Sequence, residues 1–179
     1  MKSTPNQYGT VAVTLHWLSA AVIVALLTSG FLSGYASSEV ARKTILAAHV
    51  PMGLGILVLT VLRIGWWLVA DRKPAPAQEG NALQNRLARI VHTLTYVLIL
   101  FVCISGIGMM ALTGAADVLF DVTAGPLPDF TEVGPRAGHG LGVRLLMGLL
   151  ALHVVAALYH HFLRKDQSLA RMWYLDDKA

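Results

Sequence analysis

Histidines that interrupt apolar stretches are the residues of this sequence best able to do chemistry. The chain carries seven of them, namely His16, His49, His92, His139, His153, His160 and His161. A polar side chain within a membrane is costly and marks a functional position by default, although one lone histidine could simply bond to a neighbouring helix. Imidazole is also the commonest metal ligand in proteins. Several histidines at matched depths therefore indicate metal coordination.

The apolar stretches that carry these histidines are long enough to cross a membrane. We expect four spanning helices, at about 11–33, 44–69, 90–113 and 138–163, because about 20 apolar residues cross the hydrocarbon at about 1.5 Å per residue. Hydrophobic residues make up 55% of the 179 residues and charged residues only 13%, about half the usual share in soluble domains. The sequence predicts an all-α transmembrane four-helix bundle in the lipid bilayer, with one membrane domain over residues 1–179.

The basic residues predict the orientation of this bundle, because an even number of spans places both termini on one side. Ten of the 14 fall on that side, namely Lys2, Arg63, Arg72, Lys73, Arg86, Arg89, Arg164, Lys165, Arg171 and Lys178. The other four are Arg42, Lys43, Arg136 and Arg144. The positive-inside rule then predicts cytoplasmic termini. Since the basic residues flank the spans, the net charge of +4 indicates membrane topology and not nucleic-acid binding.

Two pairs of histidines are expected at matching depths. His16 and His153 both fall about 8 Å from the cytoplasmic surface, and His49 and His139 both fall near the opposite surface. His139 and His153 are 14 residues apart, so they differ by about 40° in direction and about 21 Å in height. This spacing predicts two stacked haems, each with axial histidines from two helices. Zinc fits less well, because it needs three or four ligands at one point.

The mode of haem attachment follows from the cysteine content. Cys103 is the single cysteine of the chain, and no Cys-x-x-Cys-His motif occurs. Covalent attachment of the c type is therefore excluded, and both haems are expected to be non-covalent haem b.

Several neighbouring residues leave alternatives open. Arg63 lies 14 residues after His49 and either neutralises a haem propionate or is a topology charge at the membrane surface. His160 lies seven residues after His153, about 20° off the same face, and either lines a quinone pocket or is an interfacial histidine. His92 is a rival ligand for the cytoplasmic-side haem, and His161 is expected at headgroup level.

Glycines near the histidines have two interpretations. They either let a flat macrocycle approach the backbone or serve ordinary helix packing. The glycines concerned are Gly53, Gly106, Gly108, Gly140 and Gly142, and Gly106 and Gly108 are expected to break the third helix.

These residues resemble the prokaryotic cytochrome b561 family, especially its superoxide oxidase members. The similarity covers about residues 8–173 and rests on Val13–Trp17, His49-Val50, Arg63, His139, His153 and the tail around Tyr159–Met172. The resemblance implies a four-helix bundle in the bacterial inner membrane with two haems b. It implies that His16 and His153 hold one haem and His49 and His139 the other. It further implies electron transfer from periplasmic superoxide to ubiquinone.

Three functions remain to be weighed. The first is a superoxide:quinone oxidoreductase, which needs no general acid or nucleophile at its outer haem. A rim of basic residues on that side would attract the superoxide anion, namely Arg42, Lys43, Arg136 and Arg144. Acidic residues on the same side weaken this attraction. The second is a cytochrome b electron-transfer subunit of a partner dehydrogenase such as a hydrogenase or formate dehydrogenase. The third, a non-redox transporter or scaffold, is disfavoured by the paired histidines. The connector 74–85 is expected to contribute to a quinone pocket.

Overall fold

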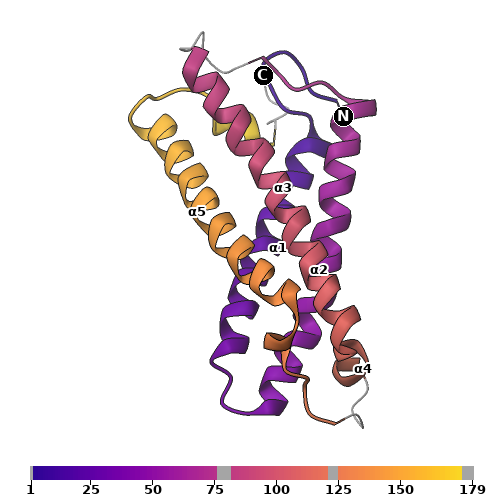
Figure 1. Ribbon diagram of the computed structural model, residues 1–179. Helices are drawn as coiled ribbons and strands as arrows, with labels where there is room; N and C mark the ends of the chain where they lie inside the picture. Colours follow the sequence, from indigo (N-terminus) through magenta and orange to yellow (C-terminus); the bar gives the residue numbers. More distant parts are fainter. Residues whose placement is uncertain (1, 76–81, 121–124, 175–179) are drawn as a thin grey trace.

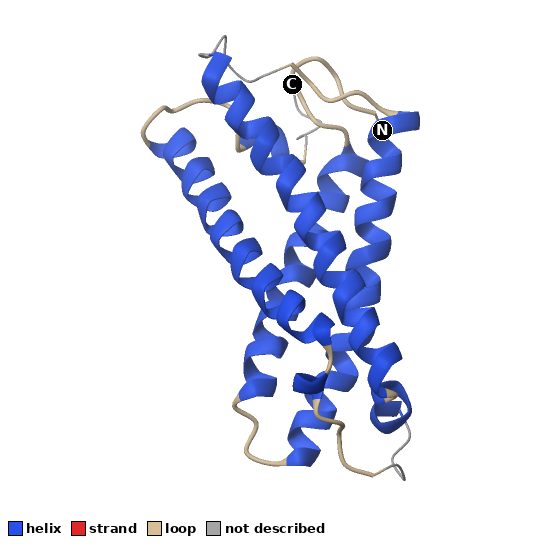
Figure 2. Cartoon of the chain, in the orientation of Figure 1, coloured by secondary structure: helices blue, strands red, loops and turns tan. Residues whose placement is uncertain are grey.

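The computed structural model describes residues 2–75, 82–120 and 125–174, which form helices and loops without any strand (Figure 2). Part of the connector 74–85 and the basic residue Lys178 lie outside these ranges. Four helices are long and apolar enough to cross a membrane, namely α1 (Thr10–Gly34), α2 (Glu39–Gly65), α3 (Ala82–Thr113) and α5 (Gly134–Phe162). The predicted four-helix transmembrane architecture is therefore confirmed.

Both described chain ends lie at the same end of the bundle (Figure 1). We call this the terminal end, and the opposite one, which carries the α1–α2 and α3–α5 connections, the loop end. A π-helical turn, Trp66–Ala70, extends α2 at the terminal end. The short helix α4 (Ala115–Phe120) and a 3₁₀ turn, Phe130–Glu132, lie in the loop-end connection.

The helices begin earlier than the apolar stretches predict. The α2 helix starts at Glu39 because the Ser38 hydroxyl accepts a hydrogen bond from the Ala41 amide at 3.2 Å and caps the first turn. The α3 helix starts at Ala82, since polar residues prolong it beyond the hydrocarbon. The expectation that Gly106 and Gly108 break this helix is wrong, because a glycine costs a helix only about 1 kcal/mol and both positions pack against α5 residues.

The bundle consists of two closely packed helix pairs, α1 with α2 and α3 with α5. Gly138 and Gly142, one turn apart on α5, allow the second contact. A Cβ atom at Gly142 would meet Val102 at 2.8 Å and Phe101 at 2.9 Å, and one at Gly138 would meet Phe101 at 3.2 Å. For Gly142 the structure therefore supports helix packing, the small-xxx-small device of membrane helices.

The four spanning helices expose many large apolar side chains on the outside of the bundle. Large side chains such as Val24, Phe31 and Val155 are each more than 60% exposed, with values of 63%, 66% and 62%. Such a surface fits lipid and not water. The chain is thus a multi-pass membrane protein.

The terminal end is held together by Arg171, whose side chain is buried. Its guanidinium donates hydrogen bonds to the Asn6 carbonyl at 2.7 Å, the Pro5 carbonyl at 3.2 Å and the Ala75 carbonyl at 2.8 Å. The Trp17 indole also donates to the Met172 carbonyl at 2.8 Å. The N-terminal segment, the α2–α3 connector and the C-terminal segment therefore form one cover over this end of the bundle.

Candidate functional site

The interior of the bundle is organised in three layers, because each long helix repeats inward-facing residues every seven positions. Seven residues are about two turns, so such positions share a helix face. The terminal level comprises His16, Arg63, His92 and His153; the middle layer Ile23, Ile56, Ile99 and Leu146; and the loop level Gly30, His49, Gly106 and His139. The middle layer is the buried hydrophobic core of the described residues. It separates two polar levels.

At the loop level, His49 of α2 faces His139 of α5. The two ring centroids are 6.5 Å apart and the ring planes are inclined by 64°. Two imidazoles bound to opposite sides of one metal at about 2 Å per bond have their ring centres about 6 Å apart. This pair therefore has the spacing of two axial ligands on one iron.

The outer nitrogens of these two rings already have partners. The Nδ1 of His139 lies 3.0 Å from the Val102 carbonyl oxygen and 3.2 Å from the Ser105 hydroxyl. Since a carbonyl only accepts, this Nδ1 carries the proton and Nε2 stays free for a metal. The Nδ1 of His49 lies 2.9 Å from the Ser29 hydroxyl. Such partners orient metal-ligating histidines.

Glycines from the other two helices complete the loop level. A Cβ atom at Gly30 of α1 would lie 3.4 Å from the Cε1 atom of His49, and one at Gly106 of α3 would lie 3.4 Å from the Cε1 atom of His139. Any side chain longer than alanine would push against these rings. Gly106 thus lies against the histidine, whereas a Cβ atom at Gly108 would lie 3.2 Å from Pro135 and one at Gly53 would meet nothing within 4 Å.

The terminal level brings three histidines together. The His16 and His153 ring centroids are 6.3 Å apart, and those of His92 and His153 are 5.6 Å apart. His16 and His153 come from different helix pairs, as His49 and His139 do, whereas His92 and His153 project from the paired helices α3 and α5. A flat group between the two helix pairs therefore fits between His16 and His153 at the terminal level as it fits between His49 and His139 at the loop level.

Arg63 adds a cation to the terminal level. One of its terminal nitrogens lies 3.1 Å from the His16 Nδ1, and its guanidinium carbon lies 5.7 Å from the centre of the Tyr96 ring. Its Nε is buried without a hydrogen-bond partner. Across residues 2–75, 82–120 and 125–174, no ion pair to this guanidinium is present. A haem propionate fits this orphaned donor, because a buried cation needs a counter-charge.

The residues present fit haem better than a metal ion held by protein alone. Within the described part of the chain, no three histidine, cysteine, aspartate or glutamate side chains gather closely enough to hold an ion. Zinc, which takes three or four protein ligands, has no such site there. Facing pairs of imidazoles are what a porphyrin iron needs.

His160 and His161 lie in the last turn of α5 and have different surroundings. The Nδ1 of His160 lies 2.5 Å from a carboxylate oxygen of Asp166. His161 is exposed, with its ring 4.7 Å from that of Phe162. Sequence reasoning missed Asp166, although an acid shortly after a helix that ends in histidine is a signal for such a contact.

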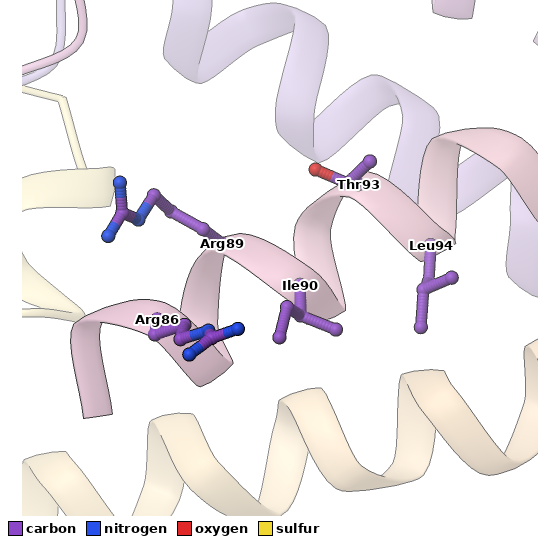
Figure 3. Close-up of a pocket in the computed structure, with 5 residues that line it drawn as sticks. All are labelled: Arg86, Arg89, Ile90, Thr93 and Leu94. Carbon is purple, nitrogen blue, oxygen red and sulfur yellow. The ribbon is translucent and has the colours of Figure 1, made fainter. Parts of the chain in front are cut away.

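Two hollows open at the terminal end. One has a volume of about 410 Å³ and is lined by Arg86, Arg89, Ile90, Thr93 and Leu94 on α3 (Figure 3). The other, of about 520 Å³, lies between the N-terminal segment and the residues around Trp67–Arg72. Both are large enough to admit part of a small organic molecule.

The basic residues expected at the loop end are not equivalent. Lys43 pairs with Glu39 at 3.7 Å and donates to the Gly125 carbonyl at 2.7 Å. Arg136 and Arg144 instead approach one another over Gly140, where a Cβ atom would lie 3.2 Å and 3.8 Å from their Nη1 atoms. The guanidinium groups of two exposed residues therefore approach one another at Gly140, the residue after His139.

Comparisons with known proteins identify the family of the chain. The family described as prokaryotic cytochrome b561 matches residues 7–174. The chain is 26% identical to a probable superoxide oxidase of Yersinia pestis, over 93% of this chain and 96% of that protein. It is also 26% identical to cytochrome b561 homolog 2 of Escherichia coli, over 95% and 93%, and 29% identical to cytochrome b562 of Cereibacter sphaeroides, over 92% and 94%. The chain therefore belongs to the prokaryotic cytochrome b561 family of membrane electron-transfer proteins that bind haem b.

Proposed function

We propose that this protein is a superoxide:quinone oxidoreductase of the bacterial inner membrane, with two haems b held at the two polar levels. The observation that carries the proposal is the pair of imidazole separations, 6.3 Å for His16–His153 and 6.5 Å for His49–His139, on either side of one apolar layer. Haem b bound at each level would supply a one-electron carrier there. The chain's own residues hold these carriers and separate them.

The loop end is the donor side. Superoxide is a small anion, and clustered positive charge raises the rate at which an anion arrives. Arg136 and Arg144 are exposed residues whose guanidinium groups approach one another at Gly140, next to His139 in the sequence. These two arginines support the role better than Lys43, which is already paired with Glu39. The name of the Yersinia relative, a probable superoxide oxidase, supports the same donor.

The terminal end is the acceptor side. Reduction of one quinone takes two electrons, from two superoxide anions that leave as oxygen, and two protons from the adjoining aqueous phase. His160 lies beyond His153 on α5 with its side chain 30% exposed, so it is placed to pass protons between water and the membrane. We assign it to a ubiquinone pocket. We assign the hollow lined by Arg86 and Arg89, drawn in Figure 3, as the route by which a quinone enters from the lipid.

Mixing experiments test this function directly. The oxidised, haem-loaded protein in detergent is mixed with superoxide, with superoxide dismutase added to a matched control. We expect the reduced haem band to appear without the dismutase only, and to disappear again when a short-chain ubiquinone is added.

Two outcomes count against the proposal. If superoxide leaves the haem oxidised although dithionite reduces it, the donor is wrong. The second function, an electron-transfer subunit of a partner dehydrogenase, would then be favoured. If the reduced protein transfers electrons to ferricyanide but not to ubiquinone, the acceptor is wrong.

A further inference from the structure

After the C-terminal end of α5 the chain turns back, so that the buried carboxylate of Asp166 lies beside His160. The Leu163 and Arg164 amides both donate to the Tyr159 carbonyl, at 3.0 Å and 3.1 Å, and close the last helical turn. The next residue, Lys165, has a φ of 53°, in the left-handed region that residues other than glycine rarely adopt. This conformation reverses the chain, so that the Asp166 amide donates to the His160 carbonyl at 3.1 Å.

The Asp166 side chain is enclosed by these contacts. It is only 3% exposed, and one of its oxygens lies 2.5 Å from the His160 Nδ1. Its other oxygen accepts a hydrogen bond from the Ser168 amide at 2.9 Å. Although burial by itself raises the pKa of the Asp166 carboxyl, the hydrogen bonds from Ser168 and His160 outweigh burial and hold this pKa below its usual value. Asp166 is therefore a carboxylate at neutral pH.

A carboxylate on Nδ1 decides what His160 can do. Because a carboxylate only accepts hydrogen bonds, Nδ1 must carry a proton. The neutral ring is then left with Nε2 as its one free proton acceptor, and Asp166 provides the counter-charge when Nε2 is protonated. In serine proteases an aspartate holds its histidine in the same manner without being protonated itself.

We propose that Asp166 is a positioning residue for proton delivery, which fixes His160 so that Nε2 passes protons to the quinone that receives the electrons. This inference rests on the proposed function of the terminal end. Its chemistry balances, since His160 gives up a proton from Nε2 to a quinone oxygen and recovers it from water. The strained conformation of Lys165 is part of the same device, because it is what brings Asp166 back to the helix.

The test uses Asp166→Asn in the haem-loaded protein, with Asp129→Asn at the loop end as the matched control. The variant protein is first reduced, and its reoxidation is followed separately with ubiquinone and with ferricyanide. Ferricyanide takes an electron without a proton. We expect Asp166→Asn to slow reoxidation by ubiquinone by about 100-fold, the usual scale of a lost general acid, and to leave reoxidation by ferricyanide unchanged. Asp129→Asn is expected to leave both rates unchanged.

A second readout does not depend on activity. Nitrogen NMR of ¹⁵N-histidine-labelled protein in the reduced state, with His160→Gln to assign the signal, is expected to show His160 protonated at Nδ1. In Asp166→Asn the ring is expected to lose this single tautomer. Equal quinone rates in Asp166→Asn and wild type, an equal loss with ferricyanide, or an unchanged His160 tautomer would each overturn the inference. Failure of ubiquinone to reoxidise the wild-type protein would instead overturn the proposed function.

Discussion

At the scale of single residues, Arg63 is a cation of the interior whose charge and hydrogen-bond donors are not fully compensated among the described residues. It lies beside His16 and over Tyr96, its Nε has no partner, and no ion pair compensates it in the described ranges. A buried cation that stays without a counter-charge is costly, so an anion is expected beside it. The carboxylate of a haem propionate is such an anion, and it arrives with the cofactor.

Replacing Arg63 by glutamine is expected to make the terminal-level haem harder to reduce, because a positive charge that favours the added electron is lost. Its reduction potential should fall by about 40–80 mV, the one-electron equivalent of about 1–2 kcal/mol for a charge roughly 10 Å away at an effective dielectric constant of about 20. A spectroscopic redox titration measures the shift. Arg72→Gln, in the exposed connector, is the control, and an equal shift in both variants would remove Arg63 from the site.

At the scale of helices, a seven-residue register places the functional residues. It explains why glycines stand opposite the loop-level histidines, since Gly30 and Gly106 occupy on α1 and α3 the positions that His49 and His139 occupy on α2 and α5. The neighbouring helix therefore approaches each imidazole closely and limits its rotation.

Leucine at Gly30 is expected to displace the His49 ring and to release the loop-level haem, so that haem content per chain falls from about two to about one. Alanine there is expected to be tolerated, because its Cβ would make an ordinary contact at 3.4 Å. Gly148→Leu is the matched control, since a Cβ atom at that position meets nothing within 4 Å. Full haem content in Gly30→Leu would show that this contact does not position His49.

Truncating a side chain of the middle layer tests how tightly that layer is packed. Ile56 is 2% exposed, and Ile56→Ala is expected to destabilise the protein by about 1–3 kcal/mol, because the cavity cost remains although lipid is as apolar as the interior. Val58→Ala, at a position 56% exposed, should change stability by less than about 0.5 kcal/mol. Thermal unfolding in detergent measures both. A similar loss for the two variants would contradict a packed middle layer.

The membrane spans and the register of the histidines could be predicted from the sequence, because hydropathy and helical period are local properties. Apolar stretches predict α1 to within one residue at each end. The early start of α3 at Ala82 could not be predicted, since polar residues at the membrane surface carry no hydropathy signal. The contacts of Ser29 and Ser105 with histidines, and the return of Asp166 to His160, depend on tertiary packing and on one unusual backbone angle.

At the scale of the whole molecule, orientation decides which level meets the donor. The excess of lysine and arginine at the terminal end predicts cytoplasmic termini. Green fluorescent protein fused to the C-terminus should therefore fluoresce in bacterial cells, and alkaline phosphatase fused there should be inactive. Arg136 and Arg144 would then face the periplasm. The reverse pattern would exchange the donor and acceptor sides.

The central claim, two haems b each held by two histidines, is tested most directly by the haem content of purified protein. Pyridine haemochrome analysis is expected to give about two non-covalent haems b per wild-type chain, about one in His16→Ala and in His49→Ala, and about two in His92→Ala. One haem per wild-type chain would contradict the account. Loss of a haem in His92→Ala together with its retention in His16→Ala would contradict the ligand assignment at the terminal level.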